Sequence, residues 1–237
     1  MKGKYRMRLA VLASNIFDRP TGQQKIQRRV IRGLRAGGAE ILLITNAAPK
    51  AADVRPSAEI AGCRVVIVPG SATPMTYLKG YRSIRRQVDD YSPDLLLTFG
   101  CSSSALGARM KKNYSLPWLH FSYEISCFRT ILKKYFIRSL KAADRIITTS
   151  RFLKNYLKDF GLSGAKIDWL RYNFGDPEVM VKEETPTGTR KKKNFLFWGD
   201  AAEGRGLEVL LKALPPFLGE NITLTLVLRY IEDRYRG

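Results

Sequence analysis

Short apolar segments alternate with longer segments of helical periodicity along most of the chain. Near-continuous apolar runs such as Leu95–Phe99 are typical of strands that are buried on both faces of a parallel sheet. Such runs predict strands at 8–14, 41–45, 64–68, 95–99, 118–121, 145–149 and 166–170. Apolar residues at helical spacing predict helices at 23–36, 77–91, 103–113, 128–142 and 150–160. Regular alternation of strands and helices predicts an α/β fold built on a parallel sheet.

The composition changes near residue 177, where the chain becomes polar, charged and rich in turn-forming residues. This change predicts a linker at 179–193 between a first domain at 1–178 and a second region at 194–237. The second region has the pattern of a strand at 194–198, a helix at 206–213 and a strand at 222–228. One βαβ unit is too small to bury a core of its own, so we expect it to be the beginning of a second α/β domain that is incomplete in this chain.

The chain is strongly basic, with 41 lysines and arginines against 21 aspartates and glutamates and a formal charge of +20 at pH 7. A field of this size attracts polyanions such as anionic membranes, nucleic acid or phosphorylated substrates. The cations gather on three predicted helical surfaces, at 25–35, 79–86 and 133–141, with aromatic residues among them. Because they are spread over several helices and the sequence has no nucleic-acid motif, nucleic acid is the least favoured of these partners.

Cysteine and histidine are too few for several classes of site. The three cysteines are far apart, and His120 is the one histidine of the chain. This pattern predicts neither a disulfide framework nor a zinc module nor a multi-histidine metal site. No apolar run reaches the ~18 residues of a membrane span. We therefore expect a cytoplasmic protein, either free or bound peripherally to the cytoplasmic membrane.

Five stretches resemble, in the same order, motifs of the GT-B glycosyltransferases, specifically the retaining family 4-like transferases (glycosyl transferases group 1). They are PDLLL at 93–97, AADRIITTSRFL at 142–153, KIDWLRYNFGD at 166–176, FLFWG at 195–199 and EGRGLEVLLKA at 203–213. The resemblance covers nearly the whole chain, but only the first half of a full-length transferase. It implies a Rossmann-like parallel sheet in an acceptor-side N-terminal domain, followed by the first βαβ unit of a second Rossmann-like domain that binds the nucleotide sugar.

The resemblance also implies the chemistry. A hexose would pass from a nucleotide diphosphate sugar to a hydroxyl of a lipid-linked or glycan acceptor, with retention of anomeric configuration. Cations and helix dipoles would hold the diphosphate, so no metal and no other cofactor is expected. The family's later donor motif, two glutamates seven residues apart, has no counterpart before Gly237. We therefore expect the isolated 237-residue chain to be inactive as a transferase.

Three residues match donor-phosphate positions of the family. Gly22 stands at the second glycine of a glycine-rich turn before a helix, where backbone amides face phosphate, and Thr21 replaces the first glycine. Gly199 matches the glycine after the first strand of the second domain. Arg205 matches the second of two diphosphate-binding cations, and its guanidinium fork suits phosphate. Asp200 stands in place of the first cation.

The family carries a histidine near the reacting sugar, six residues after a proline. In this chain His120 lies three residues after Pro117, so His120 is the family histidine if the strand is shorter, and otherwise Tyr123 or Glu124 occupies the site. His120 and Glu124 are the candidate catalytic residues. A hydrogen-bonded histidine in the core is the alternative interpretation of His120.

Polar residues that follow predicted strands are candidates for the acceptor cleft, because ligands bind at the carboxyl ends of parallel strands. They are Ser102, Ser103, Tyr123 and Ser150. Ser150 also has the position of an N-cap for the helix at 151–160, and capping is the default role of serine there.

Two other functions are consistent with the sequence. One is a non-catalytic half-transferase, a membrane- or acceptor-binding module that needs a partner chain to supply the donor domain. The other, less favoured, is a basic Rossmann-like protein that binds nucleic acid. Transfer of a sugar, binding to anionic vesicles and salt-sensitive binding to nucleic acid distinguish the three.

Overall fold

The structure of the chain is a computed structural model, and it describes residues 6–17, 22–47, 60–70, 73–123, 130–170, 193–201, 207–213 and 222–231. The chain divides into two compact units, Met1–Phe174 and Gly175–Gly237. Most of the expected linker at 179–193 lies outside the described residues, and Lys193 is already the first residue of a strand. Within the described ranges, no helix combines the length and apolar character needed to cross a bilayer.

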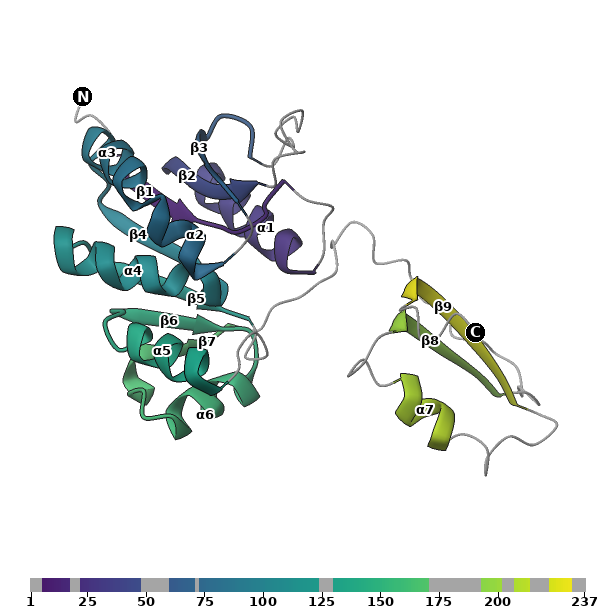
Figure 1. Ribbon diagram of the computed structural model, residues 1–237. Helices are drawn as coiled ribbons and strands as arrows, with labels where there is room; N and C mark the ends of the chain where they lie inside the picture. Colours follow the sequence, from purple (N-terminus) through teal and green to yellow (C-terminus); the bar gives the residue numbers. More distant parts are fainter. Residues whose placement is uncertain are drawn as a thin grey trace. The chain divides into compact units, whose positions relative to one another are not determined.

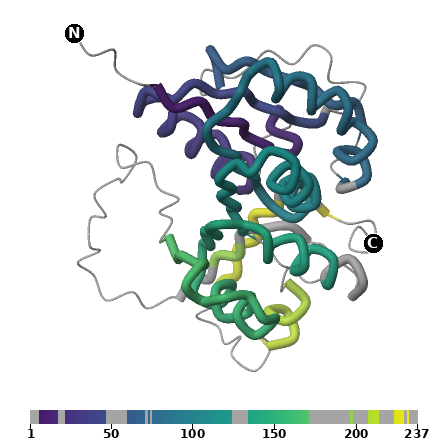
Figure 2. The backbone as a smooth tube through the Cα atoms, turned by 90° about the vertical axis from the view of Figure 1, so that its left-hand side faces the viewer, coloured from purple at the N-terminus to yellow at the C-terminus, as the bar shows by residue number. Residues whose placement is uncertain are grey.

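The first unit is built on a seven-stranded sheet in which every neighbouring pair of strands is parallel. The strands are β1 (Arg8–Leu12), β2 (Glu40–Ala47), β3 (Arg64–Pro69), β4 (Leu95–Phe99), β5 (Trp118–Ser122), β6 (Arg145–Thr148) and β7 (Ile167–Trp169). Their order across the sheet is β3-β2-β1-β4-β5-β6-β7 (Figure 1). Figure 2 shows the backbone turned by 90° from this view. The α/β fold predicted from the sequence is confirmed.

In the described residues, six helices and one 3₁₀ turn connect these strands. They are α1 (Gly22–Ala36), α2 (Pro74–Lys79), α3 (Tyr81–Tyr91), α4 (Gly100–Tyr114), α5 (Thr130–Leu140), α6 (Arg151–Asp159) and η2 (Gly164–Lys166). The single helix predicted at 77–91 is wrong. The helix begins earlier, at the Thr73 N-cap, and Gly80 divides it in two. A Cβ atom on Gly80 would lie 2.6 Å from a Val68 side-chain carbon, so only glycine allows the chain to pass this close to β3.

The strands β1, β2, β4 and β5 bury both of their faces, as their apolar runs predict, whereas the edge strands β3 and β7 are partly exposed. One core cluster joins one face of the sheet to side chains of α2 to α6, including Tyr77, Leu106 and Leu140. The other joins the opposite face to α1, including Ile26 and Ile31. Successive strand residues therefore point into different clusters, which fixes the register of the sheet.

Two aspartates tie the beginnings of neighbouring strands together. The Asp94 carboxylate accepts the Arg8 amide at 2.7 Å, and the Asp144 carboxylate accepts the Trp118 amide at 2.7 Å. The same oxygen of Asp144 pairs with the Lys111 ammonium at 2.7 Å. Burial alone raises the pKa of Asp144, but these two hydrogen bonds outweigh it, and its pKa is lowered. Both aspartates belong to the motifs that carry the family resemblance, and here they stabilise the sheet.

The second unit contains the strand β8 (Lys193–Ala201), the helix α7 (Leu207–Ala213) and the strand β9 (Ile222–Ile231). β8 and β9 are parallel, with an irregularity between Gly199 and Ala201. Leu207 is buried, whereas Leu196 and Val209 are about 70% exposed, at 68% and 70%. The described part of this unit is the βαβ unit predicted from the sequence.

Candidate functional site

The strand order reverses at β1, because β2 and β3 lie on one side of it and β4 lies on the other. The helix that follows β1 packs on one face of the sheet and the helix that follows β4 packs on the other. In open parallel sheets, the carboxyl ends of such a strand pair form the crevice in which ligands bind. Ser14 follows β1 and Ser102 lies in the first turn of α4, and their hydroxyl oxygens are 2.6 Å apart at this point.

A directed chain of hydrogen bonds starts from these serines. The buried Tyr77 hydroxyl donates to Asn46 Oδ1 at 3.1 Å, so its single hydrogen is used. The Ser14 hydroxyl, 3.0 Å from the Tyr77 oxygen, must therefore donate to it, and Ser102 in turn donates to Ser14. Such chains polarise each member and strengthen it.

The Asn46 side chain is the centre of this network and is 1% exposed. Its oxygen also accepts the Asn15 amide at 3.0 Å, and its nitrogen donates to Asn15 Oδ1 at 2.6 Å and to the Gly70 carbonyl at 3.2 Å. All four hydrogen-bonding positions of the amide are thus occupied. Asn15 accommodates the turn after β1 with a φ of 53°, a conformation that asparagine tolerates. We call Ser14, Asn15, Asn46, Tyr77 and Ser102 the carboxyl-edge cluster.

A second polar pair lies at the same edge. Gln27 of α1 is 1% exposed, and its Nε2 donates to the Tyr123 hydroxyl, just beyond β5, at 2.7 Å. Gln27 Oε1 is buried and has no hydrogen-bond partner among the described residues. Gly100 has a φ of +69°, and a Cβ there would lie 2.8 Å from the Tyr123 oxygen. Gly100 therefore makes room for the Tyr123 hydroxyl as well as beginning α4.

The cluster consists of uncharged hydroxyls and amides. Burial raises the pKa of Tyr77 to about 12, although the Ser14 side chain and the Asn46 backbone lower it, so the phenol stays neutral at physiological pH. Among the described residues, no group of three or more histidine, cysteine, aspartate or glutamate side chains is arranged to hold a metal ion. Neutral, fixed donors and acceptors of this kind are suited to binding the hydroxyl groups of a ligand.

His120 lies in the core of the first unit. Its ring is 0% exposed, packed edge-on against Trp118 and Phe136 at centroid distances of 6.2 and 5.9 Å. Its Nδ1 lies 2.7 Å from the Thr98 hydroxyl, which accepts the Trp118 indole N–H at 2.8 Å. Burial lowers the pKa of His120 to about 3. These contacts fit the hydrogen-bonded core histidine that the sequence left open as an alternative.

The other predicted site residues are divided between the cleft, the helices and the undescribed segments. The structure brings Ser102 and Tyr123 to the carboxyl edge. The buried Ser103 hydroxyl instead donates to the Phe99 carbonyl at 2.9 Å. Ser150 caps α6 by accepting the Leu153 amide at 3.1 Å, as its position predicts.

Four further predicted residues are the three on the donor side and the candidate catalytic glutamate. Gly22 is the first residue of α1, and nothing lies within 4 Å of where its Cβ would be. Gly199 is in β8, where the ladder with β9 becomes irregular. Arg205 and Glu124 lie outside the described residues.

Four residues of the site do not follow from the sequence alone. Ser14 is the last residue of the strand predicted at 8–14 and Asn15 follows it, so the rule that singled out Ser102 applies to them equally. Asn46 directly follows the predicted strand at 41–45 and carries the same signal. Tyr77 gives no such signal, because it comes from a helix predicted with the wrong beginning and because its partners are far away in sequence.

Comparison with known proteins shows the family to which the chain belongs. Residues 21–173 match the glycosyl transferase 4-like domain, which is more than half of the chain. The chain belongs to the glycosyl transferase 4-like domain family. The match contains α1 and all strands from β2 to β7, and therefore most of the carboxyl-edge cluster. The family resemblance noted in the sequence is confirmed. No curated protein matches the chain in sequence.

Solved structures resemble the glycosyl transferase 4-like chain in fold. Sucrose-phosphate synthase from Thermosynechococcus elongatus is 18% identical with a TM-score of 0.69, over 93% of this chain and 62% of that one. The lipopolysaccharide outer core galactosyltransferase WaaB is 13% identical with a TM-score of 0.66, over 97% and 62%. HepE from Anabaena, solved in complex with UDP, is 14% identical with a TM-score of 0.64, over 96% and 62%. The chain thus spans about three fifths of the length of these relatives.

Proposed function

We propose that the first unit is the acceptor-side domain of a sugar transferase that moves a hexose from a nucleotide diphosphate sugar to a hydroxyl of a lipid-linked or glycan acceptor. One observation carries this proposal: the Ser14–Ser102 contact of 2.6 Å where the strand order of a transferase-family sheet reverses. An acceptor sugar presents several hydroxyls, and a cleft edge of fixed neutral donors and acceptors matches them.

The nucleotide sugar is proposed as donor on the basis of relatives. HepE was solved with UDP and with UDP-glucose. In this chain, we assign phosphate contacts to Gly22, Gly199 and Arg205. The assignment of Gly22 is supported by its place as the first residue of a 15-residue helix. The first backbone amides of such a helix have no partner within the helix and attract an anion.

We assign the family's histidine position to Tyr123 rather than to His120. Tyr123 is the sixth residue after Pro117, the family's spacing, and it lies just past the carboxyl end of β5. His120 is in the middle of that strand and fully buried. Glu124 directly follows Tyr123 and stays a second candidate at this position.

We also propose that the first unit binds to an anionic membrane surface through α5 and the residue that follows it, Lys141. Lys134, Tyr135, Arg138 and Lys141 are all exposed, and Tyr135 is 50% exposed. Each cation near an anionic bilayer contributes about 1 kcal/mol to binding, and tyrosine favours the interface. A transferase whose acceptor carries a lipid needs such a surface.

Transfer of radiolabel tests the proposal. The purified chain is added to membranes from the organism that carries the gene, which supply acceptors and any partner chain, together with UDP-[14C]glucose. We expect incorporation into lipid or glycan that depends on the added chain. Tyr123→Phe should lower it about tenfold, which corresponds to one hydrogen bond in the site. Tyr114→Phe is the matched control, because it removes a phenol that donates to Asp89 at 2.7 Å at the other end of α4.

The same preparation distinguishes a sugar transferase from a non-catalytic membrane-binding module. If no nucleotide sugar gives incorporation above that of membranes alone, the transferase proposal is wrong. Sedimentation of the chain with anionic vesicles in that case identifies a non-catalytic membrane-binding module. Equal loss of transfer in Tyr123→Phe and Tyr114→Phe would contradict the assignment of Tyr123 to the site.

A further inference from the structure

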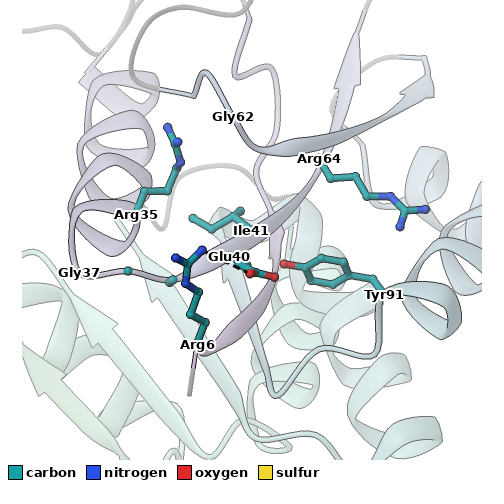
Figure 3. Close-up of a pocket in the computed structure, with 10 residues that line it drawn as sticks. Arg6, Arg35, Gly37, Glu40, Ile41, Gly62, Arg64 and Tyr91 are labelled. Atoms are coloured by element: carbon teal, nitrogen blue, oxygen red, sulfur yellow. Dashed lines mark ion pairs between the residues drawn. The ribbon is translucent and has the colours of Figure 1, made fainter. Parts of the chain in front are cut away.

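A cavity of about 590 Å³ lies at the amino end of the sheet, opposite the carboxyl-edge cluster (Figure 3). Its walls come from the residues before and at the start of β1, β2 and β3 and from the last residues of α1 and α3. They are Arg6, Arg35, Gly37, Gly38, Ala39, Glu40, Ile41, Gly62, Arg64 and Tyr91. Three arginines and one glutamate give this lining a formal charge of +2.

Arg35 lies against Gly62 at the cavity wall. Gly62 has a φ of +79°, and a Cβ built there would lie 2.5 Å from Arg35 Nη2 and 3.2 Å from its guanidinium carbon. The guanidinium therefore lies directly against the glycine, and any other residue would displace it. Among the described residues, no carboxylate forms a salt bridge with Arg35.

Glu40 is the one carboxylate that lines the cavity, and it opposes an anion. It lies 3.9 Å from Arg6, with both side chains well exposed at 47% and 72%. An exposed pair at this distance is weak, so Glu40 offsets at most the charge of Arg6. Arg64 donates to the uncharged Gln87 at 2.7 Å and keeps its full charge.

Tyr91 contributes a buried hydroxyl to the same space. The residue is 6% exposed, and its oxygen has no hydrogen-bond partner among the described residues. Figure 3 shows the phenol pointing from α3 across the cavity wall toward Glu40. The guanidinium of Arg8 lies 4.5 Å above the ring and adds positive charge behind it. A buried hydroxyl without a partner is destabilising, and a ligand atom that bonds to it removes this cost.

We propose that this cavity, the amino-edge pocket, binds the phosphate group of a small phosphorylated molecule or of a phospholipid headgroup. Guanidinium groups from α1 and from the residues before β1, together with a phenol from α3, surround the space from different elements. A tetrahedral phosphate offers oxygens in all these directions, whereas a planar carboxylate does not. The volume leaves room for the rest of the ligand beyond its phosphate.

The amino-edge pocket is independent of the transferase proposal. It shares no residue with the carboxyl-edge cluster, and it lies at the opposite ends of the strands. A ligand there would act as an anchor or as an effector, and not as the sugar donor or acceptor. Loss of transferase activity therefore does not test it, and direct binding does.

The first measurement is calorimetric titration of the purified chain with inorganic pyrophosphate in about 0.15 M NaCl, which screens long-range attraction. Arg35→Gln should weaken binding about tenfold, the effect of losing one charged hydrogen-bonding group. The matched control is Arg82→Gln, an exposed arginine of α3 outside the pocket, which has the same change in charge. Tyr91→Phe, which keeps every cation, should weaken binding by about threefold.

Substitution of Glu40 should change the affinity for pyrophosphate in the opposite direction. Glu40→Gln should tighten pyrophosphate binding, whereas Asp159→Asn, an equal change in charge on α6, should not. The second measurement is sedimentation with phosphatidylcholine vesicles that contain about one-third phosphatidylglycerol. If Arg35→Gln differs from Arg82→Gln with pyrophosphate, the ligand is a soluble phosphate. If the two differ with vesicles alone, it is a headgroup. Equal behaviour of the two variants in both measurements overturns the proposal.

Discussion

His120 makes the stability of the first unit depend on pH below its ordinary pKa of 6.5. It is the one histidine of the chain, and burial lowers its pKa to about 3 from the ordinary value of 6.5. The Thr98 oxygen already accepts the Trp118 indole, so the Thr98 hydrogen is available for His120 Nδ1. This leaves the proton of the neutral ring on Nε2, which has no partner among the described residues. Protonation of Nδ1 would convert its acceptor into a second donor in an apolar core.

The magnitude follows from the two pKa values. Above pH 6.5 the ring is neutral in the folded and in the unfolded chain, so the full stability is present. Below pH 6.5 the unfolded chain binds a proton on this ring, whereas the folded chain binds it only near pH 3. The free energy of unfolding therefore decreases as the pH is lowered from 6.5 to about 3. The slope approaches about 1.4 kcal/mol per pH unit, and the loss between pH 7 and pH 5 is about 2 kcal/mol.

The assay is urea unfolding at pH 7 and pH 5 for the native chain and for His120→Asn. Asparagine keeps an acceptor near the Thr98 hydroxyl but does not titrate. The variant should be less stable at pH 7, by about 1–3 kcal/mol for the lost ring, and should lack the additional loss of about 2 kcal/mol at pH 5. Equal losses in both proteins would refute the reasoning. The imidazole resonance offers a second check, because it should not titrate between pH 7 and pH 4 in the folded chain.

Three further predictions concern the carboxyl edge and the sheet. Asn46→Ala removes four hydrogen bonds from a buried centre, and the free energy of unfolding measured with urea should fall by about 3 kcal/mol or more. Gly100→Ala should lower Tm more than Gly161→Ala does, because Gly161 has a similar φ of +81° but no atom within 4 Å of where its Cβ would be. Adding Tyr123→Phe to Gly100→Ala should recover part of this difference in Tm. Asp144→Asn should lower the free energy of unfolding at pH 7. This deficit should shrink as the pH falls below the ordinary carboxyl pKa of 3.8, because the contacts that lower the pKa of Asp144 stabilise the fold only while the carboxylate is charged.

Most of the fold could be predicted because its signals are local. The apolar runs of strands buried on both faces stand out from the basic helices, and all seven predicted strands of the first unit are present. The break at Gly80 could not be predicted in the same way. Gly80 lies close to Val68, a residue of β3 that is far from the helix in sequence. Long-range packing here overrides a continuous helical periodicity.

The candidate site could be predicted only in part, for the same reason. Ser102 and Tyr123 follow strand ends, so chain position alone suggested them. The roles of Asn46 and Gln27 depend on partners 31 and 96 residues away, Tyr77 and Tyr123, and no spacing rule reports such pairs. His120 shows the opposite error, since its chemistry suggested a site while its position within β5 places the ring in the core.

The two edges of the sheet have different physical origins, and this determines how each should vary among related chains. The carboxyl-edge opening follows from topology, because α1 and α4 leave β1 and β4 toward opposite faces. Any chain with this strand order has that opening, whatever residues line it. The amino-edge pocket follows from particular residues, since only a glycine at position 62 lets Arg35 lie where it does. A chain that keeps the strand order but replaces Gly62 should therefore keep the carboxyl-edge opening and place the Arg35 guanidinium elsewhere.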